Sequence, residues 1–345
     1  MQTVERLLDL STTVSSLADD KISRIHGITR RSRMLALNAA IEAHRFGTVG
    51  KGFAVVADEM KAISSEISEL ASSLQGELRG RLQHMSGYAT ELNSEVESLR
   101  GERMADLAFN AIELVDRNLY ERSCDVRWWA TDKALVDAAA PGAGAETLRH
   151  AAQRLGVILE SYTVYLDLWV ADAEGRVVAS GRAGRFPAAA GASVAGEGWF
   201  QDALKTRDGG CFAVADITRV PALDNAVAAT YATAIRENGE AEGRVLGVLG
   251  IFFDWESQAR SIVQGVRLST AERDRTRCLL LDSRHRVIAS SDDSLSLGQP
   301  YPLKSGGRSQ GYYRDGGKTI GYALTPGYET YRGLGWFGVI EQDRG

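Results

Sequence analysis

The side chains best suited to bind a small molecule lie between residues 199 and 231. Trp199 and Phe200 form an aromatic pair, Asp216 follows in the segment FAVADI, and Tyr231 lies in the apolar segment ATYATAI. Aromatic faces with a carboxylate nearby suit a ligand that carries a cationic or hydrogen-bond-donating group. The alternative is that Trp199 and Phe200 only fill a hydrophobic core, as large aromatic residues often do.

No constellation in the sequence predicts catalysis. There is no phosphate-binding loop, zinc motif, or kinase or cyclase signature. The three cysteines (Cys124, Cys211 and Cys278) are far apart, and the five histidines are scattered, so neither a disulfide framework nor a metal site is indicated. We therefore expect no enzyme activity, no cofactor and no metal.

A turn between two helical segments is the most distinctive local feature. Up to Arg45 the chain is rich in strong helix formers with apolar residues at helical spacing, and the helical pattern resumes after Phe53. Gly47, Gly50 and Gly52 lie between these segments and provide the positive φ angles and close backbone approach that a tight reversal needs. The sequence predicts an antiparallel helical hairpin.

The second arm of this hairpin carries a heptad seam. Its apolar residues alternate steps of four and three: Val56, Met60, Ile63, Ile67, Leu70 and Leu74. The first arm has a broader apolar face, which favours a four-helix bundle over a two-stranded seam. Two copies of the hairpin complete such a bundle, so we expect a homodimer.

The turn resembles the hairpin tip of methyl-accepting chemotaxis proteins. The segments LALNAAIEA and GKGFAVVADE carry the resemblance, together with the intervening Arg45, Phe46 and Gly47. In that family the tip contacts the chemotaxis histidine kinase and its coupling adaptor. The resemblance implies that the same contacts, and those within the dimer, are made here by Leu35, Leu37, Asn38, Glu42, Arg45, Phe53 and Val55. The alternative is a generic antiparallel coiled coil with a glycine turn.

Several positions depart from that family's pattern. A tip phenylalanine is replaced by Arg30, a Gln-Thr-Asn run by Arg31–Ser32–Arg33, and a glutamate after the turn by Thr48. Paired Glu/Gln methylation sites are missing, because Glu66 and Glu69 stand alone. In the family, receptor dimers assemble into trimers and adapt by methylation, and these departures affect the positions used for those two processes. The residues named for the tip contacts are kept.

The C-terminal half contains an internal repeat. The segment from Leu166, LDLWVADAEGRVVASG, is similar to the segment from Arg277, RCLLLDSRHRVIASS, and a glycine-rich apolar strand follows each. A duplicated mixed α/β unit is the economical interpretation. With the long helix before it, this half resembles a double Cache sensor, which consists of two PAS-like modules in tandem.

The Cache resemblance implies a ligand site in the first module. Trp199 and Phe200 resemble the aromatic pair of Cache pockets, and Asp216 and Tyr231 follow at similar distances. The amino-acid-binding branch has an arginine where this chain has Glu197, so α-amino acids are not the expected ligands. Asp254 lies near the end of the module's last strand and completes the candidate ligand set.

A dense polar and aromatic patch precedes the first module on the predicted long helix. It contains Arg122, Arg127, Trp128, Trp129 and Asp132. We interpret it as packing of the helix onto the sheets, with its charges paired, and a ligand role is the alternative.

These observations predict an α+β chain of four parts. Residues 1–100 form the signalling hairpin with its tip near 46–52, and residues 101–145 form a connecting long helix. Residues 146–270 form a Cache module of the membrane-distal type, and residues 271–345 form the second module.

Composition excludes some partners and compartments. The 345 residues are 44% hydrophobic and 25% charged, with a net charge of −5 and no long basic run, so nucleic-acid binding is not expected. The longest apolar run, residues 245–253, is too short to span a bilayer, and no signal peptide is apparent. We expect a cytoplasmic protein.

The sequence as a whole predicts a soluble transducer. A small molecule binds the first Cache module, and the hairpin reports this to the chemotaxis kinase and coupling adaptor. The alternative is a dimeric ligand-binding or scaffold module whose hairpin no longer contacts the kinase.

Overall fold

The computed structural model describes residues 2–343, and the side chains of residues 6–343. Residue 1 of the first predicted domain and residues 344–345 of the last lie outside this range. The described chain divides between Leu99 and Arg100 into two compact units. Each unit is described by itself below.

The first unit is a helical hairpin. It contains α1 (Gln2–Arg45), a 3-10 turn η1 (Gly47–Gly50) and the first part of α2 (Lys51–Trp129). Gly47 has a φ of +59°, and a Cβ added to Gly50 would lie 2.0 Å from the carbonyl oxygen of Ala43. Both glycines are therefore required at the turn, whereas Gly52 has an ordinary helical φ and open space around it.

Small side chains line the inner faces of the two arms. Buried residues recur every seven positions along the hairpin, and all but the first are small: Ile22, Thr29, Ala36, Ala43, Gly50, Ala57, Ser64 and Ala71. Gln75 donates a hydrogen bond of 2.8 Å to Asp19 across the arms. The large residues of the predicted seam, among them Met60, Ile63 and Leu70, are exposed instead. These large residues do not pack within a single hairpin, because the small residues already occupy its inner face.

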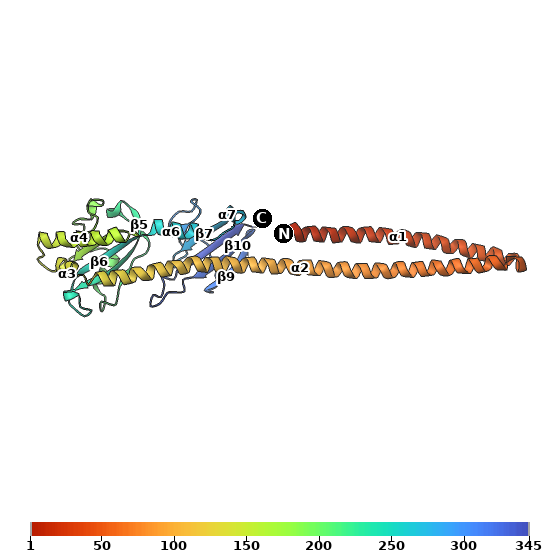
Figure 1. Ribbon diagram of the computed structural model, residues 1–345, viewed down its shortest axis with the longest axis horizontal. Coiled ribbons are helices and arrows are strands. Elements are labelled where there is room, and N and C mark those ends of the chain that lie inside the picture. The colour runs from red at the N-terminus through yellow and green to blue at the C-terminus, as the bar shows by residue number, and fades with distance from the viewer. Residues whose placement is uncertain (1, 344–345) are drawn as a thin grey trace. The chain divides into compact units, whose positions relative to one another are not determined.

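The second unit combines the rest of α2 with helices and two antiparallel sheets (Figure 1). Its further helices are α3 (Lys133–Ala139), α4 (Ala145–Ser161), α5 (Gly198–Leu204), α6 (Trp255–Gln264) and α7 (Thr270–Arg273). The strands of the first sheet are β1 (Tyr165–Asp172), β2 (Val177–Ser180), β3 (Ala213–Val214), β4 (Thr218–Val220), β5 (Ala226–Arg236) and β6 (Val245–Asp254). Those of the second are β7 (Thr276–Leu281), β8 (Val287–Ser290), β9 (Gln310–Asp315), β10 (Lys318–Leu324) and β11 (Phe337–Asp343).

The two sheets have the same topology. Their strand orders are β2-β1-β6-β5-β3 and β8-β7-β11-β10-β9, with β4 pairing β5 at one edge of the first. The first hairpin of each sheet even shares its register, since Trp169 pairs with Ser180 and Leu279 pairs with Ser290. The α+β class and the internal repeat expected from the sequence are confirmed.

One face of both sheets packs against α2. A Cβ added to Gly321 on β10 would lie 2.2 Å from the backbone of Met104, and one on Gly338 of β11 would lie 2.3 Å from the carbonyl oxygen of Ala108. These glycines allow the helix to lie directly on the second sheet. Further along, α2 meets the first sheet in the same hydrophobic core, and Figure 1 shows the helix passing along both sheets.

The connecting helix predicted over residues 101–145 is not continuous in the structure. α2 ends at Trp129, and Asp132 begins α3 by accepting a hydrogen bond of 2.9 Å from the backbone N–H of Ala134. An aspartate side chain in this position is a common helix N-cap.

Candidate functional site

A concavity of the first module lies on the face of the first sheet opposite α2. It has a volume of about 610 Å³, within the range of about 300–1,000 Å³ for small-molecule sites. Strands β1, β5 and β6 supply Trp169, Thr230 and Phe252, and α5 supplies Trp199. Three aromatic rings therefore lie close together in its lining.

Trp169 is fixed by a buried carboxylate. Its indole N–H donates to Asp167 over 2.8 Å, and Ser180 donates to the same oxygen over 2.6 Å. The backbone N–H groups of Leu168 and Arg182 donate to the other oxygen. Burial raises the pKa of Asp167, and these hydrogen bonds act in the opposite direction. Asp167 therefore fixes the ring of Trp169, and its signal in the sequence was a charged residue between the apolar residues Leu166 and Leu168.

Trp199 has a different environment. Its ring contacts Phe252 edge to face, with centroids 5.8 Å apart, and a Cβ on Gly250 would lie 3.0 Å from it. Its indole N–H forms no hydrogen bond with any group that the structure describes, although the side chain lines the cavity. This N–H is available to an acceptor atom of a ligand.

Phe200, the neighbour of Trp199 on α5, is buried and does not line the cavity. The two rings are perpendicular, 6.1 Å apart. Phe200 belongs to the hydrophobic cluster behind the cavity, so the structure gives the predicted aromatic pair two separate roles.

Charged side chains lie at the rim of the cavity. Three carboxylates, Glu197, Asp202 and Asp216, and one guanidinium, Arg219, belong to its lining, and all four residues are exposed. The Asp216 carboxylate also lies 3.9 Å from the guanidinium of Arg286 in the β7–β8 turn. The rim therefore has an excess of negative charge, which favours a cationic ligand.

Tyr231 lies on the other face of the first sheet. Thr230 lines the cavity, and successive side chains of a strand point to opposite faces, so Tyr231 faces α2. Its hydroxyl is 2.8 Å from that of Tyr331, and its ring stacks on Phe212 with centroids 5.9 Å apart. The structure does not bring Tyr231 to the cavity.

Asp254 is also separated from the cavity. It is the N-cap of α6 and accepts a hydrogen bond of 3.3 Å from the backbone N–H of Ser257. Of the five predicted ligand residues, Trp199 and Asp216 line the cavity, whereas Phe200, Tyr231 and Asp254 do not.

A polar network connects the first sheet to α2. Tyr165 on β1 donates a hydrogen bond of 2.5 Å to Asp125 of α2, and Arg122 donates to the same carboxylate oxygen over 3.2 Å. The Arg122 guanidinium also lies 5.3 Å from the ring centre of Phe253. Burial raises the pKa of both Asp125 and Tyr165. The predicted polar patch on this helix is thus partly a helix–sheet contact, and Phe253 adjoins Phe252 of the cavity.

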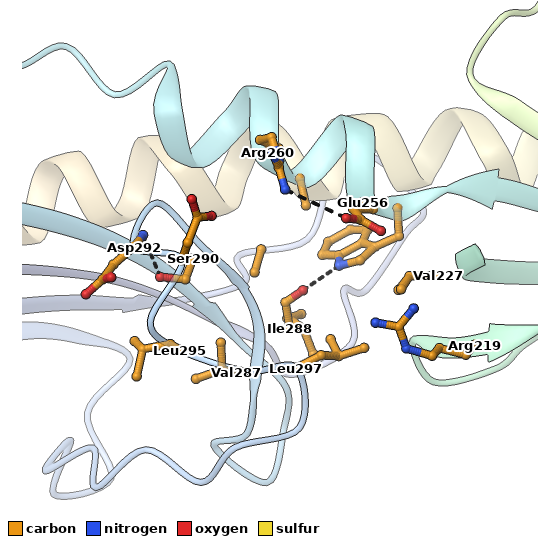
Figure 2. A pocket seen from close by; sticks show the side chains of 14 residues that line it. Arg219, Val227, Glu256, Arg260, Val287, Ile288, Ser290, Asp292, Leu295 and Leu297 are labelled. Atoms are coloured by element: carbon orange, nitrogen blue, oxygen red, sulfur yellow. Dashed lines mark hydrogen bonds and ion pairs between the residues drawn. The ribbon is translucent and has the colours of Figure 1, made fainter. Parts of the chain in front are cut away.

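Within residues 271–343, the second module has no lining equivalent to that of the first. On the matching face of its sheet, Leu279, Tyr322 and Phe337 form a hydrophobic cluster, covered by side chains of the segment 295–313. A smaller cavity of about 190 Å³ lies between the modules, beside α6 and β8. Figure 2 shows this cavity, where the indole of Trp255 donates to the carbonyl of Ile288 over 2.7 Å. Its volume is below that of typical ligand sites.

The hairpin turn carries the second candidate site. Leu35, Leu37, Asn38 and Val55 are exposed, and Phe53 is 76% exposed. Glu42 and Arg45 form an ion pair of 2.8 Å. An apolar groove of about 530 Å³ lies beside the turn, lined by Phe46, Val49, Phe53, Val56 and Met60 among others.

No group of histidine, cysteine or carboxylate side chains within residues 6–343 is arranged to hold a metal ion. None of the described helices has a stretch long and apolar enough to cross a bilayer.

The N-terminal part of the chain is similar to a known signalling domain. Residues 1–113 match the family model of the methyl-accepting chemotaxis protein (MCP) signalling domain. Methyl-accepting chemotaxis protein CtpL of Pseudomonas aeruginosa is 39% identical over 108 residues, which cover 31% of this chain and 15% of CtpL. Methyl-accepting chemotaxis protein I of Escherichia coli is 35% identical over 113 residues, 33% of this chain and 19% of that protein. The chain therefore carries an MCP signalling domain and spans less than a fifth of these relatives.

A solved structure matches most of the chain in fold. It is a domain of a sensory box/GGDEF family protein from Vibrio parahaemolyticus, with a TM-score of 0.50 and 13% sequence identity. The match covers 71% of this chain and 97% of that one. At this identity the likeness shows the fold alone.

Proposed function

We propose that this chain is a signal transducer of the chemotaxis type, and not an enzyme. It senses a small molecule in the first sensor module and signals through the hairpin tip to the chemotaxis histidine kinase and its coupling adaptor. The observation that carries the proposal is the exposure of the tip: Leu35, Phe53 and Val55 are large apolar residues that a stable hairpin has no reason to present to water. They lie within the MCP signalling domain match.

The hairpin works as a homodimer in this proposal. Its arms meet through small residues, so the large apolar residues along the outer face are left for a second copy. Packing two hairpins face to face gives the four-helix bundle expected from the broad apolar face. The groove at Phe46 and Met60 would then be filled by the partner hairpin.

The ligand is proposed to be a small organic cation. Trp199 and Phe252 offer aromatic faces, and Glu197, Asp202 and Asp216 supply negative charge at the rim. The free N–H of Trp199 and the guanidinium of Arg219 can in addition bind an acceptor group of the same molecule. The absence of an arginine at position 197 supports the expectation that α-amino acids are not ligands.

The signal is proposed to pass from the cavity to α2. The first sheet is a single layer between the cavity and α2. Phe252 lies on its cavity face, and Phe253 lies on its helix face, where the guanidinium of Arg122 covers the ring. A ligand that prefers one of two arrangements of the sheet shifts the population of the matching arrangement of the helix. α2 also provides the second arm of the hairpin.

Capture of the kinase and adaptor tests the proposal. The purified full chain should retain both proteins on a column, and Glu42→Ala or Val55→Glu should abolish retention because each alters the exposed tip. Glu66→Ala is the matched control, since it removes an exposed carboxylate of α2 outside the tip residues.

A dimeric binding or scaffold module is the competing function. It predicts that the full chain retains neither kinase nor adaptor at any concentration, while ligand binding and dimerisation are intact. The departures at Arg30 and Thr48 are the observations that favour it.

A further inference from the structure

A buried carboxylate on α2 has no role in the functions proposed above. Asp116 is 0% exposed, and its Oδ2 accepts a hydrogen bond of 2.7 Å from the backbone N–H of Gly327. Its Oδ1 has no hydrogen-bond partner among the described atoms. No lysine, arginine or histidine within residues 6–343 forms an ion pair with it. An ionised carboxylate in this position lacks the compensation that buried charges normally have.

A second unpaired polar atom lies beside it. The hydroxyl of Thr325 is buried and also has no partner. The position of a Cβ on Gly333 would lie 3.0 Å from Thr325 Oγ1 and 3.2 Å from Asp116 Oδ2, so the carboxylate and the hydroxyl approach the same point. Gly333 has a φ of +72° and leaves this space open. A protonated carboxyl has one O–H to donate, and a threonine hydroxyl can accept it after a small movement.

Other titratable groups around Asp116 do not neutralise it. Glu113, on the same helix, adds negative charge, and Arg117 is paired with Glu113 over 2.9 Å. From β5 and from the segment 325–333, Tyr231 and Tyr331 approach as a hydrogen-bonded pair of neutral phenols. Within residues 110–122 of α2 the other charged or titratable side chains are Tyr120, Glu121 and Arg122, and those of the segment 325–333 are Tyr328, Glu329 and Arg332.

We propose that Asp116 is a proton-binding site through which pH controls the contact between α2 and the segment 325–333. When the carboxyl holds its proton, the contact is closed and no charge is buried. When the proton leaves to solvent, the carboxylate is more stable where water reaches it, so the segment opens from α2. The proton is then a second input to the chain, separate from the ligand of the first module.

The electrostatics of the closed contact determine whether the contact opens or closes as the pH rises. Burial, with a smaller contribution from Glu113, raises the pKa of Asp116 from 3.8 to about 6, against the effect of the Gly327 N–H. The closed form therefore binds more protons than the open form between these two pKa values. Opening becomes more favourable as the pH rises through this window and is constant above it.

Amide hydrogen exchange of the full chain tests this proposal without any ligand or kinase. Asp116→Asn keeps the shape of the side chain, can still accept from Gly327, and is neutral at every pH. The exchange rate of the amides in segment 325–333 is measured for wild type and for Asp116→Asn at each pH. The ratio of the two rates is used because the intrinsic pH dependence of amide exchange is the same in both proteins and cancels. The ratio of wild type to Asp116→Asn should rise by about tenfold between about pH 5 and pH 7 and then level off.

The matched control is Glu113→Gln, which removes a carboxylate one turn away on the same helix. The ratio of wild-type to Glu113→Gln exchange rates should change much less with pH than the ratio of wild-type to Asp116→Asn rates. A wild-type to Asp116→Asn ratio independent of pH would overturn the proposal. If Asp116→Asn fails to fold, the infrared band of a protonated carboxyl in the wild type decides: the proposal requires it at pH 5 and its loss by pH 7, and its absence at pH 5 overturns it.

Discussion

At the scale of single residues, the two tryptophans of the cavity differ in what holds them. Trp169 is anchored through its N–H to Asp167, which is itself saturated by hydrogen bonds, whereas the N–H of Trp199 has no partner among the described groups. A saturated group supports the site, and an unsatisfied one in a cavity can bind a ligand. We therefore propose that Trp199 contacts the ligand and that Trp169 supports the site.

The rim carboxylate Asp216 provides a test of the ligand's charge. An amine found by thermal-shift screening of small organic cations should bind Asp216→Asn about 10 to 100 times more weakly than wild type, because a charged hydrogen bond contributes about 1.5–3 kcal/mol. Isothermal titration calorimetry of the full chain measures the change.

The matched control for Asp216 is Asp254→Asn. Asparagine caps a helix about as well as aspartate, so α6 should be undisturbed and the affinity unchanged. Equal affinity of wild type and Asp216→Asn for every cation that binds would show that the rim charge does not select the ligand.

Asp116 should also affect global stability. Its folded pKa of about 6 lies above the unfolded value of 3.8, so the folded state loses stability as the pH rises through that window. Relative to Asp116→Asn, the wild-type free energy of unfolding of the second unit should fall by up to about 3 kcal/mol between about pH 4 and pH 7. Urea titrations at several pH values measure it, and parallel pH profiles would refute the assignment.

At the scale of the elements, Gly50 and Gly52 near the turn differ in whether a larger residue can replace them. Gly50→Ala should destabilise the hairpin, because its Cβ would lie 2.0 Å from the Ala43 carbonyl oxygen. Gly52→Ala should stabilise it by up to about 1 kcal/mol, since alanine has the higher helix propensity and nothing lies near. Thermal unfolding followed by circular dichroism compares them, and equal effects would contradict the turn geometry.

The turn and the repeat were predictable because their causes are local. Glycines at 47 and 50 lie between two helical patterns, and the paired segments after Leu166 and Arg277 share residues that form the same turn, such as Asp172 and Asp282. Each aspartate accepts a hydrogen bond of 2.8 Å from the backbone N–H four residues later.

The composition of the site was less predictable, because it depends on which face each residue takes. The resemblance to Cache pockets correctly placed Trp199 in the cavity lining. It did not place Tyr231 correctly, because Tyr231 follows the cavity residue Thr230 on the strand and therefore points to the opposite face. Asp167 was missed because only the folded hairpin brings Ser180 and Arg182 to it. The small residues at the inner face of the hairpin were not singled out from the sequence, because the heptad pattern of the large apolar residues is the stronger signal there.

At the scale of the whole molecule, we expect a second copy of the chain to cover the exposed apolar face of the hairpin. Met60→Glu and Ile63→Glu place charges on that face and should convert a dimer into a monomer in sedimentation velocity experiments. Lys61→Glu adds an acidic residue at an exposed polar position between them and should leave the dimer intact. A wild-type chain that sediments as a monomer would contradict the proposed bundle.

The most direct test of the transducer is the activity of the kinase itself. Autophosphorylation of the chemotaxis kinase is measured with its adaptor, with and without the full-length chain. The account predicts that the wild-type chain changes the rate several-fold and that Val55→Glu, at the exposed tip, has no effect on it, whereas Glu66→Ala acts as wild type. A rate that is the same with wild type, with Val55→Glu and with no chain present would contradict the account and leave the scaffold as the function.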